Sequence, residues 1–297
     1  MEIAYLLNRF CDYSTFIRGY SPDTIIRYRQ VVTYYCKTAE ITDIEQITEK
    51  NVRDYFYFGR EIKKWKASTF ITKHKTLVVF FRWCITEGHM KTNFADDIET
   101  PRLEKRLPPK LTRKEALRLL ETVYNFPYSY KFLRSRNHAI FATFIYAGLR
   151  KKELLNLKFT DIDLDNMSIF INQGKGSKDR ILPICSKLAD SLQRYLIDRK
   201  RLRKTCPEFF VSLNHNMGFT VNGLAHLVKK LRKSTDIKFT IHKLRHTFAT
   251  LMIEGGCDIY SLSRMMGHSD IKTTTIYLAA TAEHLRNQIK KHPLNII

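Results

Sequence analysis

A proline-rich stretch does most to limit how this chain can fold. Residues 99–111 read ETPRLEKRLPPKL, and Pro101, Pro108 and Pro109 interrupt any regular helix through them. Thr112 and Glu115 follow with the spacing of a capping box, which predicts that a new helix begins there. We therefore expect two separately folded domains, residues 1–100 and 112–280, joined by a linker at 101–111.

The charge of the chain predicts a polyanionic partner. Lys and Arg number 51 against 29 Asp and Glu, a net charge of +22 that exceeds what solubility needs. Residues 1–110 carry 19 basic and 14 acidic side chains, whereas the remainder carries 32 and 15. The second domain should therefore neutralise most of the phosphate of a bound nucleic acid.

Other features of the sequence narrow the class of protein. The six cysteines are scattered without a C-x-x-C pair, so we expect no zinc site. No signal peptide is recognised, and no apolar run reaches the length of a membrane span. We expect a cytoplasmic, nucleoid-associated protein.

Residues 1–100 show the hydrophobic spacing of a small helical bundle. Helices are predicted over 3–18, from Pro22 onward behind an N-cap at Ser21, over 49–64 and over 68–87. The aromatic residues of the third helix are assigned to the core. Basic residues around the fourth helix form either a solvated face or a surface that faces DNA: Lys63, Lys64, Lys66, Lys73 and Lys75.

Residues 112–280 are predicted to be mostly helical with a small antiparallel sheet. Strand-like segments 168–171 and 180–183 flank a turn-rich hairpin that carries Lys175. An apolar helix is expected near 136–147, with others over 186–204, 221–233, 242–255, 258–266 and 270–278. The stretch 124–136 is interpreted as a loop, either an ordinary surface loop or one that contacts DNA or a second protomer. The expected fold class is mainly α, with a small antiparallel β-sheet, in two domains.

Two arginines and two histidines suit the chemistry of phosphoryl transfer. Arg150 and Arg245 can each donate two hydrogen bonds to phosphate oxygens and remain charged. His242 and His268 can donate to a further oxygen or move a proton near neutral pH. Such cations stabilise the charge that develops on phosphorus oxygens in the transition state.

A nucleophile and an acid complete this candidate site. Tyr277 supplies a phenol, whose ionisation neighbouring cations would favour, and we favour His242 as its base. An alkoxide leaving group needs a proton, and Lys175 on its hairpin fits that role. The sequence offers no carboxylate cluster for Mg²⁺ and no phosphate-binding loop for ATP, so no cofactor is expected.

The chain resembles the tyrosine recombinase (phage integrase) family. The resemblance lies in four segments: AGLRKKELLNLKFTDID with Arg150, GKGSKDRILPI with Lys175, IHKLRHTFATLMIEGG with His242 and Arg245, and MMGHSDIKTTTIY with His268 and Tyr277. Residues 1–98 resemble the helical core-binding domain of the same family.

This resemblance implies a function and an assembly. Two domains would clamp DNA, and Tyr277 would form a 3′-phosphotyrosyl link that a second 5′-hydroxyl reverses. A homodimer would occupy one inverted-repeat site, and a homotetramer would exchange strands through a Holliday junction. Glu153 would support Arg150. Residues 281–297 would dock on a neighbouring protomer, although a frayed tail is an alternative.

Several functions stay open at this point. The compact layout resembles Xer-type recombinases, which favours chromosome or plasmid dimer resolution, or integration and excision of a mobile element. A type IB topoisomerase shares the same chemistry. A non-catalytic DNA-binding accessory protein is the alternative of another class. An accessory or activating protein is a further candidate partner, but the sequence names neither this protein nor the target site.

Overall fold

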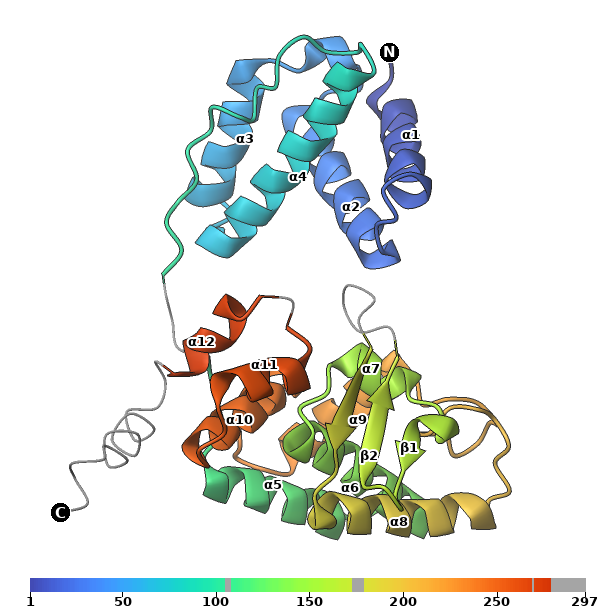
Figure 1. Cartoon of the computed structure of the whole chain (residues 1–297). Helices are drawn as coiled ribbons and strands as arrows, with labels where there is room; N and C mark the ends of the chain where they lie inside the picture. The colour runs from blue at the N-terminus through green and yellow to red at the C-terminus, as the bar shows by residue number, and fades with distance from the viewer. Residues whose placement is uncertain (105–107, 173–178, 269, 279–297) are drawn as a thin grey trace, which may run out of the picture. The chain divides into compact units, whose positions relative to one another are not determined.

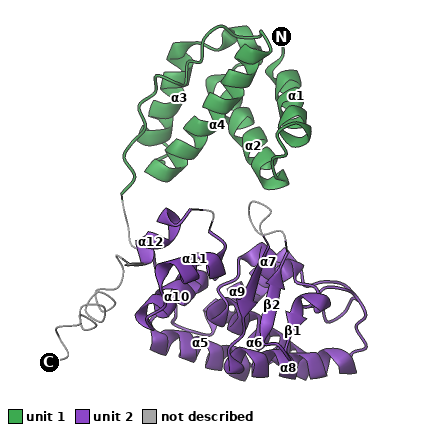
Figure 2. Cartoon of the chain, viewed as in Figure 1, with its two compact units in different colours: residues 1–105 green, residues 106–297 purple. Residues whose placement is uncertain are grey.

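The chain divides into two compact units, Met1–Lys105 and Arg106–Ile297 (Figures 1 and 2). The structure, a computed structural model, describes residues 1–104, 108–172, 179–268 and 270–278. The boundary between the units falls inside the predicted linker, and each unit buries a hydrophobic core of its own. Within these ranges, no helix combines the length and apolar character that crossing a bilayer requires.

The described part of unit 1 is a helical bundle. Its elements are α1 (Ile3–Phe16), α2 (Pro22–Ala39), the 3-10 helix η1 (Ile44–Gln46), α3 (Glu49–Glu61) and α4 (Ala67–Thr86). Pro22 occupies the first position of α2, where its missing N–H costs no hydrogen bond. Tyr55 and Phe56 of α3 are buried, as the aromatic pattern predicted. The four predicted helices are therefore confirmed.

One of the basic residues of unit 1 lies among aromatic rings. The Lys73 ammonium lies 4.3 Å from the centroid of the Tyr34 ring and 4.6 Å from that of Trp65. Burial lowers the pKa of this ammonium. Lys73 therefore packs against aromatic residues of the bundle through cation–π contacts. From the sequence, only a solvated face or a DNA-facing surface was considered for this residue.

The described part of unit 2 consists mostly of helices, together with one small antiparallel sheet (Figure 1). The elements are α5 (Arg113–Asn125), α6 (Lys131–Tyr146), α7 (Lys151–Asn156), η2 (Phe159–Asp161), β1 (Ile162–Asp163), β2 (Ser168–Ile171), β3 (Arg180–Pro183), α8 (Ser186–Arg201), α9 (Val221–Lys233), α10 (Ile241–Glu254), α11 (Ile259–Met266) and α12 (Lys272–Leu278). The predicted mainly α fold with an antiparallel sheet is confirmed.

The sheet has one strand more than the sequence indicated. Strand β2 pairs antiparallel with β3, and Ile169 lies opposite Leu182. On its other edge β2 pairs with β1, which spans only two residues. A strand this short shows no alternation of apolar and polar residues, so the pattern missed it.

Helix α5 ends only at Asn125 and α6 begins earlier than predicted, so the interpretation of 124–136 as a loop is wrong for its first two and its last six residues. Helix α6 starts at Lys131 rather than near residue 136. Phe132 is buried, and the buried Arg136 donates from Nη1 to the carbonyl of Val211 at 3.1 Å. Three buried residues near the start of α6 are polar: Ser135, Arg136 and Asn137. The first turns of this helix therefore show no apolar stripe in the sequence. The same helix packs against α5, α8 and α10 and ends beside Gly148.

Candidate active site

The turn between α6 and α7 fixes the position of Arg150. Gly148 has φ +62°, and a Cβ there would lie 2.2 Å from the buried ring of Phe248 in α10. Only glycine allows this backbone conformation together with such a close approach. The turn places Arg150 directly before α7, where its backbone N–H donates to Oε2 of Glu153 at 2.7 Å.

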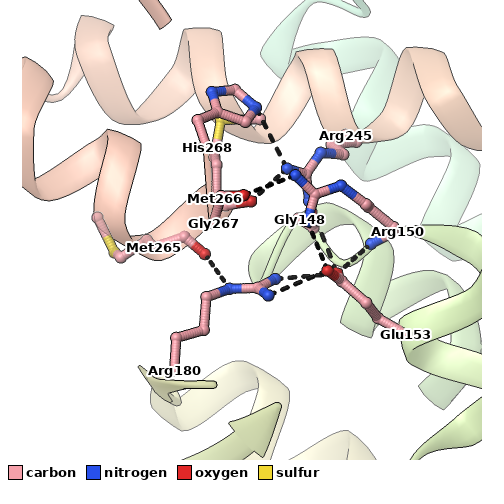
Figure 3. A network of polar contacts seen from close by, with 9 residues as sticks. All are labelled: Gly148, Arg150, Glu153, Arg180, Arg245, Met265, Met266, Gly267 and His268. Carbon is pink, nitrogen blue, oxygen red and sulfur yellow. Dashed lines mark hydrogen bonds and ion pairs between the residues drawn. The ribbon is translucent and has the colours of Figure 1, made fainter. Parts of the chain in front are cut away.

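Glu153 joins two arginines from distant parts of the chain (Figure 3). Its Oε1 accepts from Nη1 of Arg150 at 2.6 Å. Arg180 in β3 donates from Nη1 and Nη2 to the two oxygens of Glu153, at 3.0 and 2.9 Å. The Glu153 carboxylate therefore holds α7 to the sheet through a fork-to-fork ion pair.

The charge of Glu153 is stabilised by this arrangement. Its side chain is 6% exposed. Burial raises the pKa of the Glu153 carboxyl, but the hydrogen bonds and charge of Arg180, followed by the hydrogen bonds of Arg150, outweigh it and lower the pKa to about 2. Glu153 is therefore ionised at neutral pH and offsets part of the positive charge around it.

Arg245 in α10 links three segments of the site. It is 4% exposed, and its Nη1 donates to the carbonyl of Gly148 at 2.6 Å. Its Nη2 donates to the carbonyl of Met266 and lies 3.3 Å from Nε2 of His268. Burial, followed by the charge of Arg150, lowers the pKa of Arg245 to about 10, so the guanidinium stays charged at neutral pH.

His268 follows the end of α11 and is neutral. Its Nε2 faces the Arg245 guanidinium, which has only protons to offer, so this nitrogen is the acceptor. The remaining nitrogen, Nδ1, then carries the proton and donates to Oγ1 of Thr274 at 2.7 Å. Burial and the nearby arginines, Arg245 foremost, lower the pKa of His268 to about 4.

Gly267 lets this turn approach the arginines. It ends α11 with φ +61°, and a Cβ there would lie 2.9 Å from Nη1 of Arg180. Its carbonyl accepts from Nη2 of Arg150 at 2.8 Å, while the carbonyl of Met265 accepts from Nε of Arg180 at 2.8 Å. The end of α11 is thus held by the same two arginines that bind Glu153.

Tyr277 in α12 forms a pair with His246 of α10. The phenol oxygen lies 2.7 Å from Nδ1 of His246. Tyr277 is 2% exposed, and burial raises its pKa although the charge of Arg245 opposes this. Burial, followed by the neighbouring His242, lowers the pKa of His246 to about 4. At neutral pH the phenol therefore donates its proton to a neutral imidazole.

The structure brings together most of the residues that the sequence singled out. Arg150, Arg245 and His268 form one contiguous set of contacts, and Tyr277 lies within the electrostatic influence of Arg245. The His242 ring packs edge-to-face against the His246 ring, with ring centroids 4.3 Å apart. Lys175 and the C-terminal residues 281–297 lie outside the described residues.

Two residues of the site were not predicted from the sequence. His246, not the favoured His242, is the histidine that hydrogen-bonds Tyr277. The two histidines lie four residues apart on one face of α10, which is the signal that could have found His246. Arg180 is separated from Glu153 by 26 residues of sequence and gave no local signal.

The site contains no built metal centre in the part of the chain that the structure covers. Among the described residues, no group of three or more His, Cys, Asp or Glu side chains is arranged to hold a metal ion. A cavity of about 640 Å³ is lined by Glu153 and by Ile171 of β2, among others. Its lining does not include Arg150, Arg245, His268 or Tyr277. The chemistry that the cluster offers is that of charged hydrogen-bond donors beside a phenol and an imidazole.

Two family profiles match the chain. Residues 109–284, more than half of the chain, match the phage integrase family. The chain belongs to this family. Residues 6–88 match the N-terminal SAM-like domain of phage integrases. The resemblance inferred from the four segments is therefore confirmed, and the chain is a site-specific tyrosine recombinase.

Similar proteins include Xer recombinases of archaea and bacteria. Tyrosine recombinase XerA of Thermococcus onnurineus is 32% identical over 94% of this chain and 93% of its own length. Tyrosine recombinase XerD of Halalkalibacterium halodurans is 31% identical, with 95% of each chain covered.

Solved structures show the same fold. A crystal structure of XerA recombinase covers 98% of both chains at 29% identity, with a TM-score of 0.54. The XerH site-specific recombinase bound to its difH substrate covers 96% of this chain and 83% of its own at 20% identity, with a TM-score of 0.71. The Tn1549 transposon integrase in complex with transposon right end DNA has a TM-score of 0.72 at 20% identity, covering 98% of this chain and 99% of its own.

Proposed function

We propose that the chain cuts and rejoins double-stranded DNA at a specific site through a covalent link to Tyr277. The observation that carries this proposal is the short contact between the buried Tyr277 phenol and the neutral His246, on the same helix as Arg245. A phenol is a poor nucleophile until it loses its proton, and this geometry supplies a base within hydrogen-bond reach.

In the first step the Tyr277 oxygen attacks the scissile phosphorus while its proton passes to Nδ1 of His246. Arg150 and Arg245 donate to the non-bridging oxygens, on which charge builds up in the transition state. Arg150 is the more accessible of the two, because a quarter of its side chain is exposed against 5% for Arg245. Glu153 binds the guanidinium of Arg150 and lies 3.8 Å from that of Arg245. Arg180 holds Glu153 in turn, and neither is assigned a contact with the substrate.

The bond between phosphorus and the 5′-oxygen breaks, which leaves a 3′-phosphotyrosyl link. The departing 5′-oxygen takes a proton from Lys175, which we keep as the general acid. Attack by the 5′-hydroxyl of a second strand reverses the step and completes a strand exchange, with a Holliday junction as intermediate. His242 and His268 are further donors to the phosphate or to the proton transfer.

The phenol must become accessible before this chemistry can begin. Tyr277 packs in a small cluster with Phe248, Ile253, Leu262 and Met266 and is 2% exposed. A scissile phosphate reaches it only when α12 shifts. Binding of DNA, or of a second protomer, is the event that we propose to shift it.

The partner is double-stranded DNA at an inverted-repeat site. A homodimer would occupy one site and a homotetramer would form the synapse. The N-terminal unit would serve as the core-binding domain and residues 281–297 as a docking segment between protomers. The DNA complexes of XerH and the Tn1549 integrase support the nucleic-acid partner. The biological role, dimer resolution or movement of a mobile element, depends on the site that is recognised.

A nicked duplex tests this function. The recognised site is first selected from a pool of duplexes by binding to the protein. A nick is then placed near the cleavage point, so that cleavage releases a short strand and the covalent adduct is trapped. We expect an adduct with the natural protein and none with Tyr277→Phe. If neither protein forms an adduct on a site that both bind, the proposed enzymatic activity is refuted. Fast supercoil relaxation by a single protomer without recombinant products would favour a type IB topoisomerase instead.

A further inference from the structure

A second feature of unit 2 is a basic pocket between α5, α6 and α8. It is a cavity of about 280 Å³, and its charged residues are Lys131 and Arg134 of α6 with Arg194, Asp198 and Arg201 of α8. Figure 1 shows α5, α6 and α8 together along one side of the unit. We call this set, with Tyr124, Ile197, His138 and Ser191, the basic pocket.

The cations of the basic pocket are not balanced by acids. Asp198 is its only carboxylate, and Arg201 already donates to Asp198 at 3.2 Å. Within the residues that the structure describes, Lys131, Arg134 and Arg194 form no ion pair. The exposed side chains of Lys131, Arg134 and Arg194 therefore present positive charge at the mouth of the cavity, where an anionic group can bind them.

The floor of the basic pocket is polar and ordered. His138 and Ser191 are joined by a hydrogen bond of 2.7 Å between Nδ1 and Oγ, and Ser191 is 1% exposed. Burial, followed by the charge of Arg194, lowers the pKa of His138 to about 4, so its imidazole is neutral and adds no charge. The pocket therefore offers fixed hydrogen-bonding groups below a rim of cations.

The rim is also partly apolar. Tyr124 is 40% exposed and Ile197 is 54% exposed, and the Arg134 guanidinium lies 5.8 Å from the centroid of the Tyr124 ring. An inorganic anion would satisfy the cations but would leave these apolar groups in water. A ligand that combines carboxylates with aliphatic or aromatic groups would cover both.

The basic pocket is separate from the recombination site. His138 and Tyr146 lie eight residues apart in α6, a rise of roughly 12 Å, and the catalytic turn with Gly148 and Arg150 begins beyond Tyr146. A DNA duplex is too wide to enter this cavity, so its phosphates can meet only the exposed cations at the mouth. A peptide side chain can enter the cavity.

We propose that the basic pocket binds an acidic segment of a partner protein, one that carries Glu or Asp beside aliphatic or aromatic residues. Carboxylates of the segment pair with Lys131, Arg134 and Arg194, and its apolar side chains cover Tyr124 and Ile197. The proposal does not depend on the DNA chemistry, because the pocket shares no residue with the site.

A short fluorescein-labelled peptide of Glu, Leu and Tyr tests this proposal with the full chain at physiological salt. The pocket variant is Arg134→Gln with Arg194→Gln, both exposed, so the fold is retained. The matched control is Lys114→Gln with Lys187→Gln, exposed residues of α5 and α8 outside the pocket. We expect the pocket variant to bind the peptide about tenfold more weakly, and the control variant to bind it like the natural protein.

Duplex DNA and a second peptide complete the experiment. The pocket and control variants should bind a random duplex equally, and a peptide with Gln in place of Glu should not bind. Absence of binding by the Glu peptide would overturn the proposal. Equal loss in both variants would assign the binding to general surface charge. A loss of duplex affinity in the pocket variant alone would make the pocket a DNA contact instead.

Discussion

Replacing Glu153 by Gln should destabilise unit 2 by about 3 kcal/mol. Glutamine keeps the shape of the side chain but removes the charge that holds Arg150 and Arg180. The pKa of Glu153 is lowered from 4.5 to about 2 in the folded protein. Because a tenfold change in an equilibrium constant is about 1.4 kcal/mol, this separation corresponds to about 3 kcal/mol of folding free energy.

The burial of the ion pair leads to a similar loss of folding free energy. The side chains of Glu153 and Arg180 are 6% and 9% exposed, so solvent screens their interaction little. Removing one partner of a buried ion pair costs about 3–5 kcal/mol, because the other charge is left uncompensated. Some of that cost is relieved here, since the Nε of Arg180 keeps its bond to the carbonyl of Met265.

The two tryptophans make the assay selective. Trp65 and Trp83 are the only ones in the chain, and both belong to unit 1. In urea unfolding, tryptophan fluorescence therefore follows unit 1, whereas far-UV circular dichroism follows both units. For Glu153→Gln we expect the circular dichroism transition of unit 2 to shift by about 1 M urea, with the fluorescence transition unchanged.

The pH dependence of this difference follows from the lowered pKa. A carboxyl with a depressed folded-state pKa contributes its full stability above its unfolded value, here 4.5, and loses it as pH falls toward about 2. The gap between the natural protein and Glu153→Gln should therefore be constant above about pH 5 and shrink below it. A stability loss under about 0.5 kcal/mol at pH 7 would refute the reasoning, since surface substitutions cost that much.

The base, the glycine turn and the charge of unit 2 can each be tested separately. For His246→Ala, adduct formation should fall at least about tenfold at pH 7 and then rise steadily toward the pKa of the phenol, because the base is gone; equal loss at every pH would remove His246 as the base. For Gly148→Ala, thermal unfolding should show a loss of about 2–4 kcal/mol from the positive φ and the clash with Phe248, whereas Gly88→Ala, with positive φ but open space, should lose only about 1 kcal/mol. Affinity for duplex DNA should fall steeply with salt, given the 32 basic and 15 acidic residues beyond position 110, and a flat response would contradict phosphate-dominated binding.

Local signals in the sequence predicted the elements of the fold well. Pro22 and the capping box at Thr112 mark helix starts that the structure confirms, because capping chemistry depends only on neighbouring residues. The start of α6 was missed because Arg136 and Asn137 are polar yet buried. Their burial depends on partners far along the chain, such as the carbonyl of Val211.

In the site, too, some residues were predictable from sequence spacing, whereas others were identified only by the three-dimensional structure. The spacing of polar residues singled out Arg150, Arg245, His268 and Tyr277, and the structure brings the first three into one set of contacts. Only the three-dimensional arrangement identifies Arg180 as the partner of Glu153. The same is true of the base: His242 and His246 share one face of α10, and the position of α12 decides which of them meets the phenol.

Mapping the covalent link identifies the side chain that attacks the DNA. After trapping on a nicked duplex, the adduct is digested with nuclease and protease, and the peptide that carries nucleotides is identified by mass spectrometry. We predict a single modified residue, Tyr277, linked through a 3′-phosphate. A link to any of the other tyrosines, such as the exposed Tyr260, or a 5′-phosphate linkage, would contradict the proposed mechanism.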